Sequence, residues 1–401
     1  MNVSREIISR LRSKGLIREC TVIPDYSEFC ITNIAPTVAQ FLGINLESGI
    51  PLQKTDVIRQ ALGENGFFRQ YEHVILLFID SFNDTLMNHL ISQSFSGKRS
   101  VEGMLTSTFP SVTPTCLASM LTGMPPISHG VVGFNLLIDG WIYSVFDLTS
   151  PLDDRKLPAE RVREIFDLPD IFAASRASGI EARMIVPHAL AEEGTRRIID
   201  GELLIEGYRS FKEMVSIMED NKAGFTYAYI STFDELLHEL GIGAPMISNE
   251  LLCLTDALRS LHIENTLLFL VSDHYHLELD QDNVIDLDDE RLTSDLIHPP
   301  AISGGRMAYI YTSNPDRAVA FLEDKYDERV IILRSEDAVR CGIFGRGEMA
   351  DDFCERIGEI TLIAKDRGWI DYPYKKRQRH KASHGGLRRE EMLVPFAFIE
   401  L

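Results

Sequence analysis

Five short stretches of the chain are almost continuously apolar, a pattern typical of strands buried on both faces of a sheet. They are His73–Ile79, Ala182–Val186, Phe225–Ile230, Thr266–Val271 and Met392–Ile399. Helical patterns lie between several of these stretches, over Asp170–Ser178, Asp234–Leu240 and Asn249–Leu261. This alternation predicts an α/β fold with a mostly parallel central sheet, in which sites form beyond the carboxyl ends of the strands.

A different pattern runs from Ile302 to about Lys365. Strand-like and helix-like segments (RMAYIYT, PDRAVAFLEDKY, RVIILRS, ITLIAK) follow each other closely there and predict a small α+β cap inserted into the main fold. We therefore expect three parts: an N-terminal helical segment over residues 1–70 that packs on the main domain, a main domain over 71–301 and 366–401, and a cap over 302–365.

The composition is that of an ordinary globular protein, with 45% apolar and 25% charged residues. A net charge of −20 argues against a long nucleic acid as partner, but a bound cation could still attract a small phosphorylated molecule. The six cysteines form no CxxC pair, and the sequence contains neither a signal-peptide pattern nor an apolar run of the roughly 20 residues that span a membrane. These features predict a cytoplasmic protein without a membrane partner, and they leave its oligomeric state open.

Acidic and histidine side chains follow the predicted strands. Asp80 follows the first strand, the pair Asp234 and His238 follows the third, Asp273 and His274 follow the fourth, and His384 precedes the last. Each position has a structural alternative: a helix cap for Asp80, a surface i,i+4 pair for Asp234 and His238, a cap and a surface histidine for Asp273 and His274, and a turn for His384.

Together, these side chains predict a metal centre. Three carboxylates and three imidazoles suit two Zn²⁺ ions that each keep an open position, although other divalent metals would also fit. No cysteine belongs to the set, so a structural zinc site of the thiolate type is not indicated. The predicted ligands are Asp80, Asp234, His238, Asp273, His274 and His384.

Thr113 is the candidate nucleophile. It stands just before Pro114 and an apolar helical run, so we expect Thr113 at the N-cap, with its hydroxyl at the helix N-terminus, where backbone N–H groups favour a phosphate. The alternative is a threonine that only caps the helix. Coordination to Zn²⁺ would lower the pKa of the hydroxyl and activate it for attack.

These motifs resemble the alkaline phosphatase superfamily, nearest its nucleotide pyrophosphatase/phosphodiesterase branch. The similar segments are IDSF, the segment from FPSVTPTC to GVVGFN, DELLHELG, SDHYH and SHGGL, and they occur in the order of the family. The resemblance implies an alkaline-phosphatase-like three-layer sandwich. It also implies one zinc held by Asp80, Asp273 and His274 with Thr113, and another held by Asp234, His238 and His384. Asn135 would bind a phosphoryl oxygen.

The sequence departs from the family at several points. Tyr275 and His276 follow the Asp-His pair where the family commonly has glycine first, and we expect His276 to line the site or to lie on the surface, with a role as a spare ligand the alternative. Cys116 stands where the eukaryotic branch often carries asparagine. The segment Ile31–Ile44 resembles one that many members carry after the last histidine, which implies a circularly permuted helix beside the last strand.

The resemblance implies hydrolysis of a phosphodiester or pyrophosphate bond through a covalent phospho-threonine. The substrate would be a small phosphorylated molecule such as a nucleotide. Phosphomonoester or phosphonate hydrolysis is the alternative within the superfamily, and a catalytically silent binding scaffold is the alternative outside enzymes.

Overall fold

The computed structural model describes residues 20–401, except 53–55, 68, 70, 194–202, 221–223 and 376–378. Its centre is a seven-stranded sheet in which only the last strand, β17, runs antiparallel to its neighbours. This architecture confirms the predicted fold class. In spatial order the strands are β2 (Ser100–Thr106), β17 (Leu393–Glu400), β8 (Thr266–Val271), β1 (His73–Ile79), β7 (Phe225–Ile230), β5 (Ala182–Pro187) and β6 (Leu204–Tyr208).

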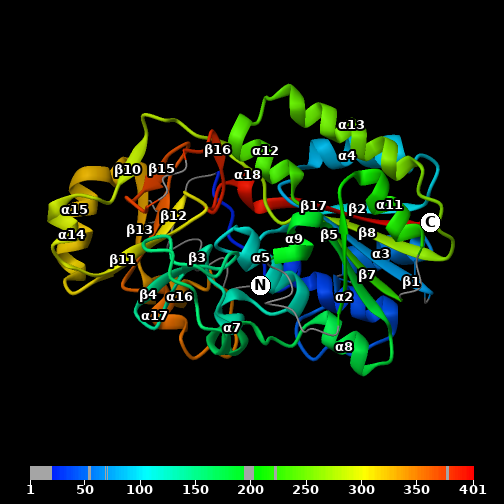
Figure 1. The fold of residues 1–401 in the computed structure, drawn as a ribbon, viewed down its shortest axis with the longest axis horizontal. Helices are drawn as coiled ribbons and strands as arrows, with labels where there is room; N and C mark the ends of the chain where they lie inside the picture. Colours follow the sequence, from blue (N-terminus) through cyan, green and yellow to red (C-terminus); the bar gives the residue numbers. More distant parts are fainter. Residues whose placement is uncertain are drawn as a thin grey trace.

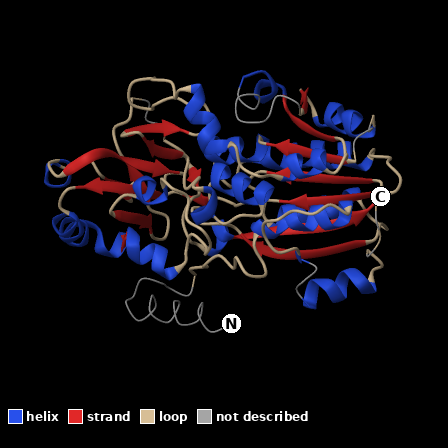
Figure 2. Ribbon diagram, turned by 90° about the horizontal axis from the view of Figure 1, so that it is seen from below, coloured by secondary structure: helices blue, strands red, loops and turns tan. Residues whose placement is uncertain are grey.

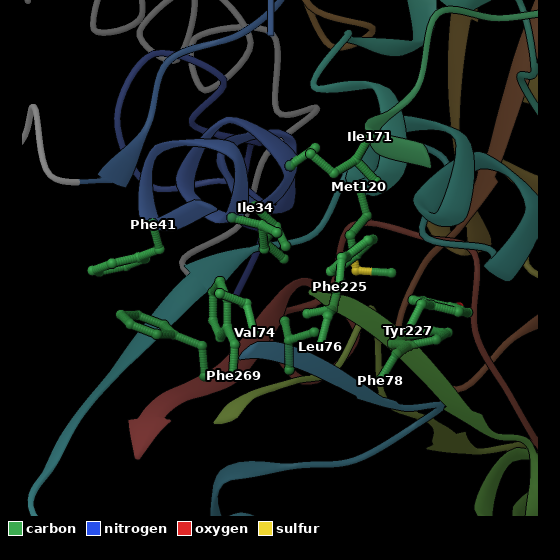
Figure 3. Close-up of a cluster of buried hydrophobic side chains, with 14 of the residues drawn as sticks. Ile34, Phe41, Val74, Leu76, Phe78, Met120, Ile171, Phe225, Tyr227 and Phe269 are labelled. Atoms are coloured by element: carbon green, nitrogen blue, oxygen red, sulfur yellow. The ribbon is translucent and has the colours of Figure 1, made fainter. Parts of the chain in front are cut away.

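Helices cover both faces of this sheet because its central strands are apolar on both sides. In β1, Val74, Leu76 and Phe78 face one core, and the residues that alternate with them face the other. Figure 3 shows the first of these cores, where side chains of α2 and α5 lie against β1. The first face is covered by α2 (Ile34–Leu42), α3 (Asp56–Glu64), α5 (Thr113–Thr122) and α8 (Ile171–Ala177), and the second by α4 (Asp84–Ser94), α11 (Phe211–Glu219), α12 (Thr232–Leu240) and α13 (Pro245–Arg259).

The sequence pattern located the five inner strands but missed the two at the edges. β2 reads SVEGMLT and β6 reads LIEGY, and both are partly exposed because each pairs with a neighbour on one side only. A half-exposed edge strand does not need a continuous apolar run, so the pattern used for buried strands could not find it.

A second, four-stranded antiparallel sheet lies beside the first along the long axis of the molecule (Figures 1 and 2). α15 (Pro315–Tyr326) covers one face of it, and α16 (Ser335–Cys341), α17 (Phe353–Ile357) and the hairpin β3–β4 (Asn135–Ile138, Trp141–Ser144) cover the other. Its strands are β11 (Leu296–Ser303), β12 (Met307–Thr312), β14 (Ile360–Ala364) and β13 (Val330–Arg334). The sheet begins before residue 302, and the short pair β10–β15 (Val284–Asp286, Trp369–Asp371) flanks it, so the proposed cap boundaries remain a prediction.

A fully buried ion pair joins the second sheet to the end of the chain. Arg306, between β11 and β12, forms contacts of 2.7 and 3.2 Å with both carboxylate oxygens of Glu391 in α18 (Arg389–Met392). Both side chains are 0% exposed. Glu391 also accepts hydrogen bonds from the backbone N–H groups of Gly386 and Arg388, at 2.9 and 3.1 Å. The pair therefore fixes the loop that follows His384.

The helix α2 packs on the central sheet. The Phe41 ring contacts the Phe398 ring of β17, with centroids 5.6 Å apart. The circular permutation inferred for Ile31–Ile44 remains a prediction, and residues 1–19 lie outside the described part of the chain. No helix among the described residues is long and apolar enough to cross a membrane.

Candidate metal centre and active site

The carboxyl ends of three neighbouring strands bring five of the predicted ligands together. β1 lies between β7 and β8, so Asp80, at the end of β1, meets Asp273 and His274 from the end of β8. Asp234 and His238 lie one turn apart on α12, which begins directly after β7. The sixth, His384, follows β16 (Ala382–Ser383), and Figure 1 shows α12, β16 and α18 near the middle of the molecule.

The predicted ligands form two clusters. The second cluster consists of Asp234, His238 and His384. The Nε2 atoms of the two histidines are 3.1 Å apart, and each lies 3.6 Å from Asp234 Oδ1. The Nδ1 atoms lie 2.9 and 2.8 Å from the carbonyl oxygens of Ala382 and Ser111. A carbonyl oxygen only accepts, so Nδ1 of each ring carries the hydrogen. Both Nε2 lone pairs therefore face each other, an arrangement that a cation stabilises.

The first cluster consists of Asp80, Asp273, His274 and the hydroxyl of Thr113. His274 Nε2 lies 3.2 Å from Asp273 Oδ2, 3.7 Å from Asp80 Oδ1 and 3.2 Å from Thr113 Oγ1. Thr113 Oγ1 donates to Asp80 Oδ2 at 3.3 Å. Asp273 Oδ2 is buried and has no hydrogen-bond donor, which leaves it available to a metal.

The spacing of these atoms fits bound metal ions. Ligand atoms about 2.0–2.1 Å from one tetrahedral zinc ion lie roughly 3.3 Å from each other. The separations of 3.1–3.7 Å in the two clusters are close to that value. The donor set of imidazole nitrogen and carboxylate oxygen, without thiolate, also suits zinc and other divalent ions.

The pKa values of the buried carboxyl groups also favour bound metal ions. Burial and the neighbouring carboxylate of Asp234 raise the pKa of Asp273 to about 8, and burial with Asp273 and Asp234 nearby raises the pKa of Asp80 well above its usual range. Burial would also raise the pKa of Asp234, but His238, His276 and His384 lower it well below its usual range. Cations in the clusters would offset the repulsion between these carboxylates.

The histidines of the site are held neutral, the form that binds metal. Burial lowers the pKa of His238 to about 4 and that of His384 to about 3, and it lowers the pKa of His274 well below its usual range. A neutral imidazole keeps one lone pair for a metal, so no proton has to leave these rings at neutral pH before metal binds.

Thr113 occupies a different helix position from the one expected. Val112 is the N-cap residue of α5, and Thr113 is the first residue inside the helix. Its side chain makes no capping hydrogen bond and instead points its hydroxyl at Asp80 and His274. The alternative that Thr113 only caps the helix is therefore wrong.

Asn135 lies in β3, and its amide Nδ2 donates to the Ile302 carbonyl oxygen at 2.8 Å. No hydrogen bond joins Asn135 to either cluster in the part of the chain that the structure describes. Its predicted contact with a phosphoryl oxygen remains a prediction.

Several residues around the clusters were not among the predicted ligands. His276 is buried beside the second cluster, with Nε2 2.8 Å from Asp234 Oδ1, so its expected site-lining role holds and the surface alternative is wrong. His276 belongs with Asp234, His274 and His384 to a group of side chains that could hold a metal. Tyr229 donates to Asp80 Oδ2 at 2.7 Å, and the His380 ring lies 4.2 Å from that of His238. The only signal for His276 in the sequence was its place two residues after His274.

The sequence model described as type I phosphodiesterase / nucleotide pyrophosphatase matches residues 74–387. The chain belongs to this family. The matched range contains every residue of both clusters, and it makes the chain a hydrolase of phosphoric ester bonds with a site that can hold metal. No curated protein matches the sequence significantly.

Several solved structures have a fold similar to that of this chain. Human ectonucleotide pyrophosphatase/phosphodiesterase 5 is 16% identical, with 81% of this chain and 87% of that chain covered and a TM-score of 0.58. An inactive variant of the murine protein in complex with AMP has 16% identity over 81% and 87% of the two chains and a TM-score of 0.57. Phosphonoacetate hydrolase from Sinorhizobium meliloti 1021, in complex with phosphonoformate, has 18% identity over 82% and 91% and a TM-score of 0.58. At these identities, the similarity shows the fold.

Proposed function

We propose that this protein hydrolyses phosphodiester or pyrophosphate bonds of small phosphorylated molecules, including nucleotides, with Thr113 as the nucleophile. The observation that carries the proposal is the position of the Thr113 hydroxyl, 3.2 Å from His274 Nε2 and 3.3 Å from Asp80 Oδ2. A threonine hydroxyl beside metal-ligand atoms, at the start of a helix, can attack an anion that the helix N-terminus attracts.

Two metal ions would complete the site, and we propose zinc. The first cluster would hold one through Asp80, Asp273, His274 and Thr113, and the second would hold the other through Asp234, His238 and His384, with His276 beside it as a further donor. Bound metals would lower the pKa of the Thr113 hydroxyl and neutralise charge on the phosphoryl oxygens.

The chemistry assigned to the protein is a two-step transfer. In the first step Thr113 Oγ1 forms a bond to phosphorus while the bond from phosphorus to the leaving oxygen breaks. Thr113 Oγ1 donates its hydrogen to Asp80 Oδ2 at 3.3 Å, so this proton leaves through Asp80 as the bond to phosphorus forms and ends on the leaving oxygen. In the second step water adds to the phospho-threonine, the bond between Oγ1 and phosphorus breaks, and the free hydroxyl returns. Asn135 would contribute the second hydrogen of its amide to a phosphoryl oxygen.

The charges near the site favour a diester over a monoester. A monoester carries an additional negative charge that an arginine or lysine would have to offset. The buried Arg306 is engaged with Glu391, and no lysine or arginine side chain forms an ion pair with either cluster among the described residues.

The six cysteines are all unpaired, which supports the further proposal of a reducing compartment such as the cytoplasm.

The test compares hydrolysis of bis-p-nitrophenyl phosphate, p-nitrophenyl phosphate and phosphonoacetate by protein of known metal content. We expect the highest kcat/KM for the diester, loss of activity with a chelator and recovery with Zn²⁺. Preference for the monoester or the phosphonate would contradict the diester assignment and support the corresponding alternative.

The nucleophile is tested separately with Thr113→Ala and Thr113→Ser. The alanine variant should bind both metals with less than about one thousandth of the wild-type kcat, because the loss of a nucleophile typically costs several orders of magnitude. The serine variant keeps a hydroxyl and should retain measurable turnover. Near-normal turnover by Thr113→Ala would refute the role of this residue.

A further inference from the structure

Ser81 follows Asp80 directly and has an unusual backbone conformation for its residue type. Its φ is +59°, in the left-handed region that glycine adopts at little cost, and its side chain is 0% exposed. Non-glycine residues held in this region carry backbone strain and tend to occur at functional sites. The hydroxyl of Ser81 is therefore the feature that requires an explanation.

This hydroxyl contacts a residue of each cluster. Ser81 Oγ lies 3.0 Å from His274 Nδ1, in the first cluster, and donates to Asp234 Oδ1, in the second, at 2.8 Å. A weaker contact of 3.4 Å reaches Asp80 Oδ1. A hydroxyl has a single hydrogen, so it can donate to His274 or to Asp234 but not to both.

The state of the first cluster decides which of the two receives that hydrogen. When His274 Nε2 serves as a metal ligand, the ring carries its hydrogen on Nδ1 and donates it to Ser81 Oγ, so the Ser81 hydrogen goes to Asp234. Without a metal, Nε2 can carry the hydrogen and donate to Thr113 Oγ1, 3.2 Å away. Nδ1 is then an acceptor that competes with Asp234 for the Ser81 hydrogen.

We propose that Ser81 is a positioning residue that couples the two metal sites. Occupation of the first cluster directs the Ser81 hydrogen to Asp234 and fixes this carboxylate for the metal of the second cluster. By linkage, occupation of the second cluster favours metal in the first by the same factor. The inference rests on the two-metal site of the proposed function and adds a cooperative order to its assembly.

The experiment titrates metal-depleted protein with Zn²⁺ and follows both binding steps by calorimetry and by competition with a chromophoric chelator. The variant Ser81→Gly removes the hydroxyl and tolerates the backbone conformation. Wild-type protein should bind two ions cooperatively. Ser81→Gly should bind the ion of the second cluster roughly 10–100-fold more weakly and without cooperativity, because a metal ligand that loses its hydrogen-bond partner usually loses affinity to this extent. Ser81→Ala, which keeps a Cβ, should behave in the same way and provides a second variant should Ser81→Gly fail to fold.

The matched control is Ser119→Ala. Ser119 Oγ lies 2.8 Å from His129 Nε2, so this change also removes a buried contact between serine and histidine, but outside both clusters. It should leave cooperativity unchanged. Two ions bound with equal cooperativity by wild type and both Ser81 variants would overturn the coupling while leaving the proposed function intact. Failure of the wild type itself to bind two ions would refute the proposed two-metal site, and the coupling with it.

Discussion

The buried pair Arg306–Glu391 allows a quantitative prediction about stability. In the variant Glu391→Gln the side chain keeps its shape but loses its charge, and the Arg306 guanidinium remains buried at 0% exposure without an ionic partner. Removing one member of a buried ion pair costs about 3–5 kcal/mol. Both oxygens of Glu391 accept hydrogen bonds, so the NH₂ group of the glutamine would face N–H donors and could not accept from them. We therefore expect the free energy of unfolding to fall by about 4 kcal/mol.

Urea unfolding with two probes measures this loss. Trp369 adjoins Gly368, whose carbonyl oxygen accepts from Arg306, so the tryptophan fluorescence of a Trp141→Phe background reports on this region, whereas far-UV circular dichroism reports on the whole fold. The double variant Arg306→Met, Glu391→Gln removes the buried charge and should be more stable than Glu391→Gln alone. Asp337→Asn, which breaks the exposed ion pair of Asp337 and Arg340, is the control and should cost less than about 1 kcal/mol. A cost below about 1 kcal/mol for Glu391→Gln, or a double variant less stable than this single variant, would refute the assigned role.

Two further predictions concern the metal sites. Because the pKa of Asp273 is raised to about 8 in the metal-free protein, this carboxyl group is mostly protonated at pH 7, and metal binding must release that proton. Zinc affinity should therefore rise with pH up to about 8, and calorimetry at pH 7 should give heats that depend on the ionisation enthalpy of the buffer; identical heats in all buffers would contradict this expectation. In Gly304→Ala the new Cβ would lie 2.4 Å from the His384 carbonyl oxygen, so we expect zinc affinity at the second cluster to fall on the order of tenfold. Gly305→Ala is the control, since its φ is also positive at +74° but its Cβ would meet only Ser383 Oγ at 3.4 Å, and an equal loss in both variants would show that the His384 contact is not the cause.

The sequence predicted the parts of the fold in which local pattern and burial coincide. β1, β7 and β8 are buried on both faces, so their apolar runs were readable, and the polar residues directly after them marked the edge where the site forms. Thr113 was predicted as the nucleophile partly because a proline and an apolar helical run follow it; that role remains a prediction, and its position within the helix was misjudged.

Other features depend on contacts between distant residues and leave no local pattern. Arg306 and Glu391 are 85 positions apart, and each reads as an ordinary surface charge in the sequence. The contacts of Ser81 with His274 and Asp234 span 193 and 153 positions and arise only when β1, β7 and β8 lie side by side. His276 was undervalued because its proximity to Asp234 depends on the path of the chain after β8.

The position of β17 has a consequence for the order in which the molecule assembles. This strand inserts between β2 and β8, although it follows β8 in the sequence by more than a hundred residues. β2 and β8 therefore complete their backbone hydrogen bonds only after β17 has been added between them. Such long-range pairing slows folding. His384 is delivered by the segment that leads into β17, so the second cluster cannot exist before this last insertion. We therefore expect the time at which the second cluster binds zinc to report when β17 inserts into the sheet, in refolding experiments and during synthesis on the ribosome.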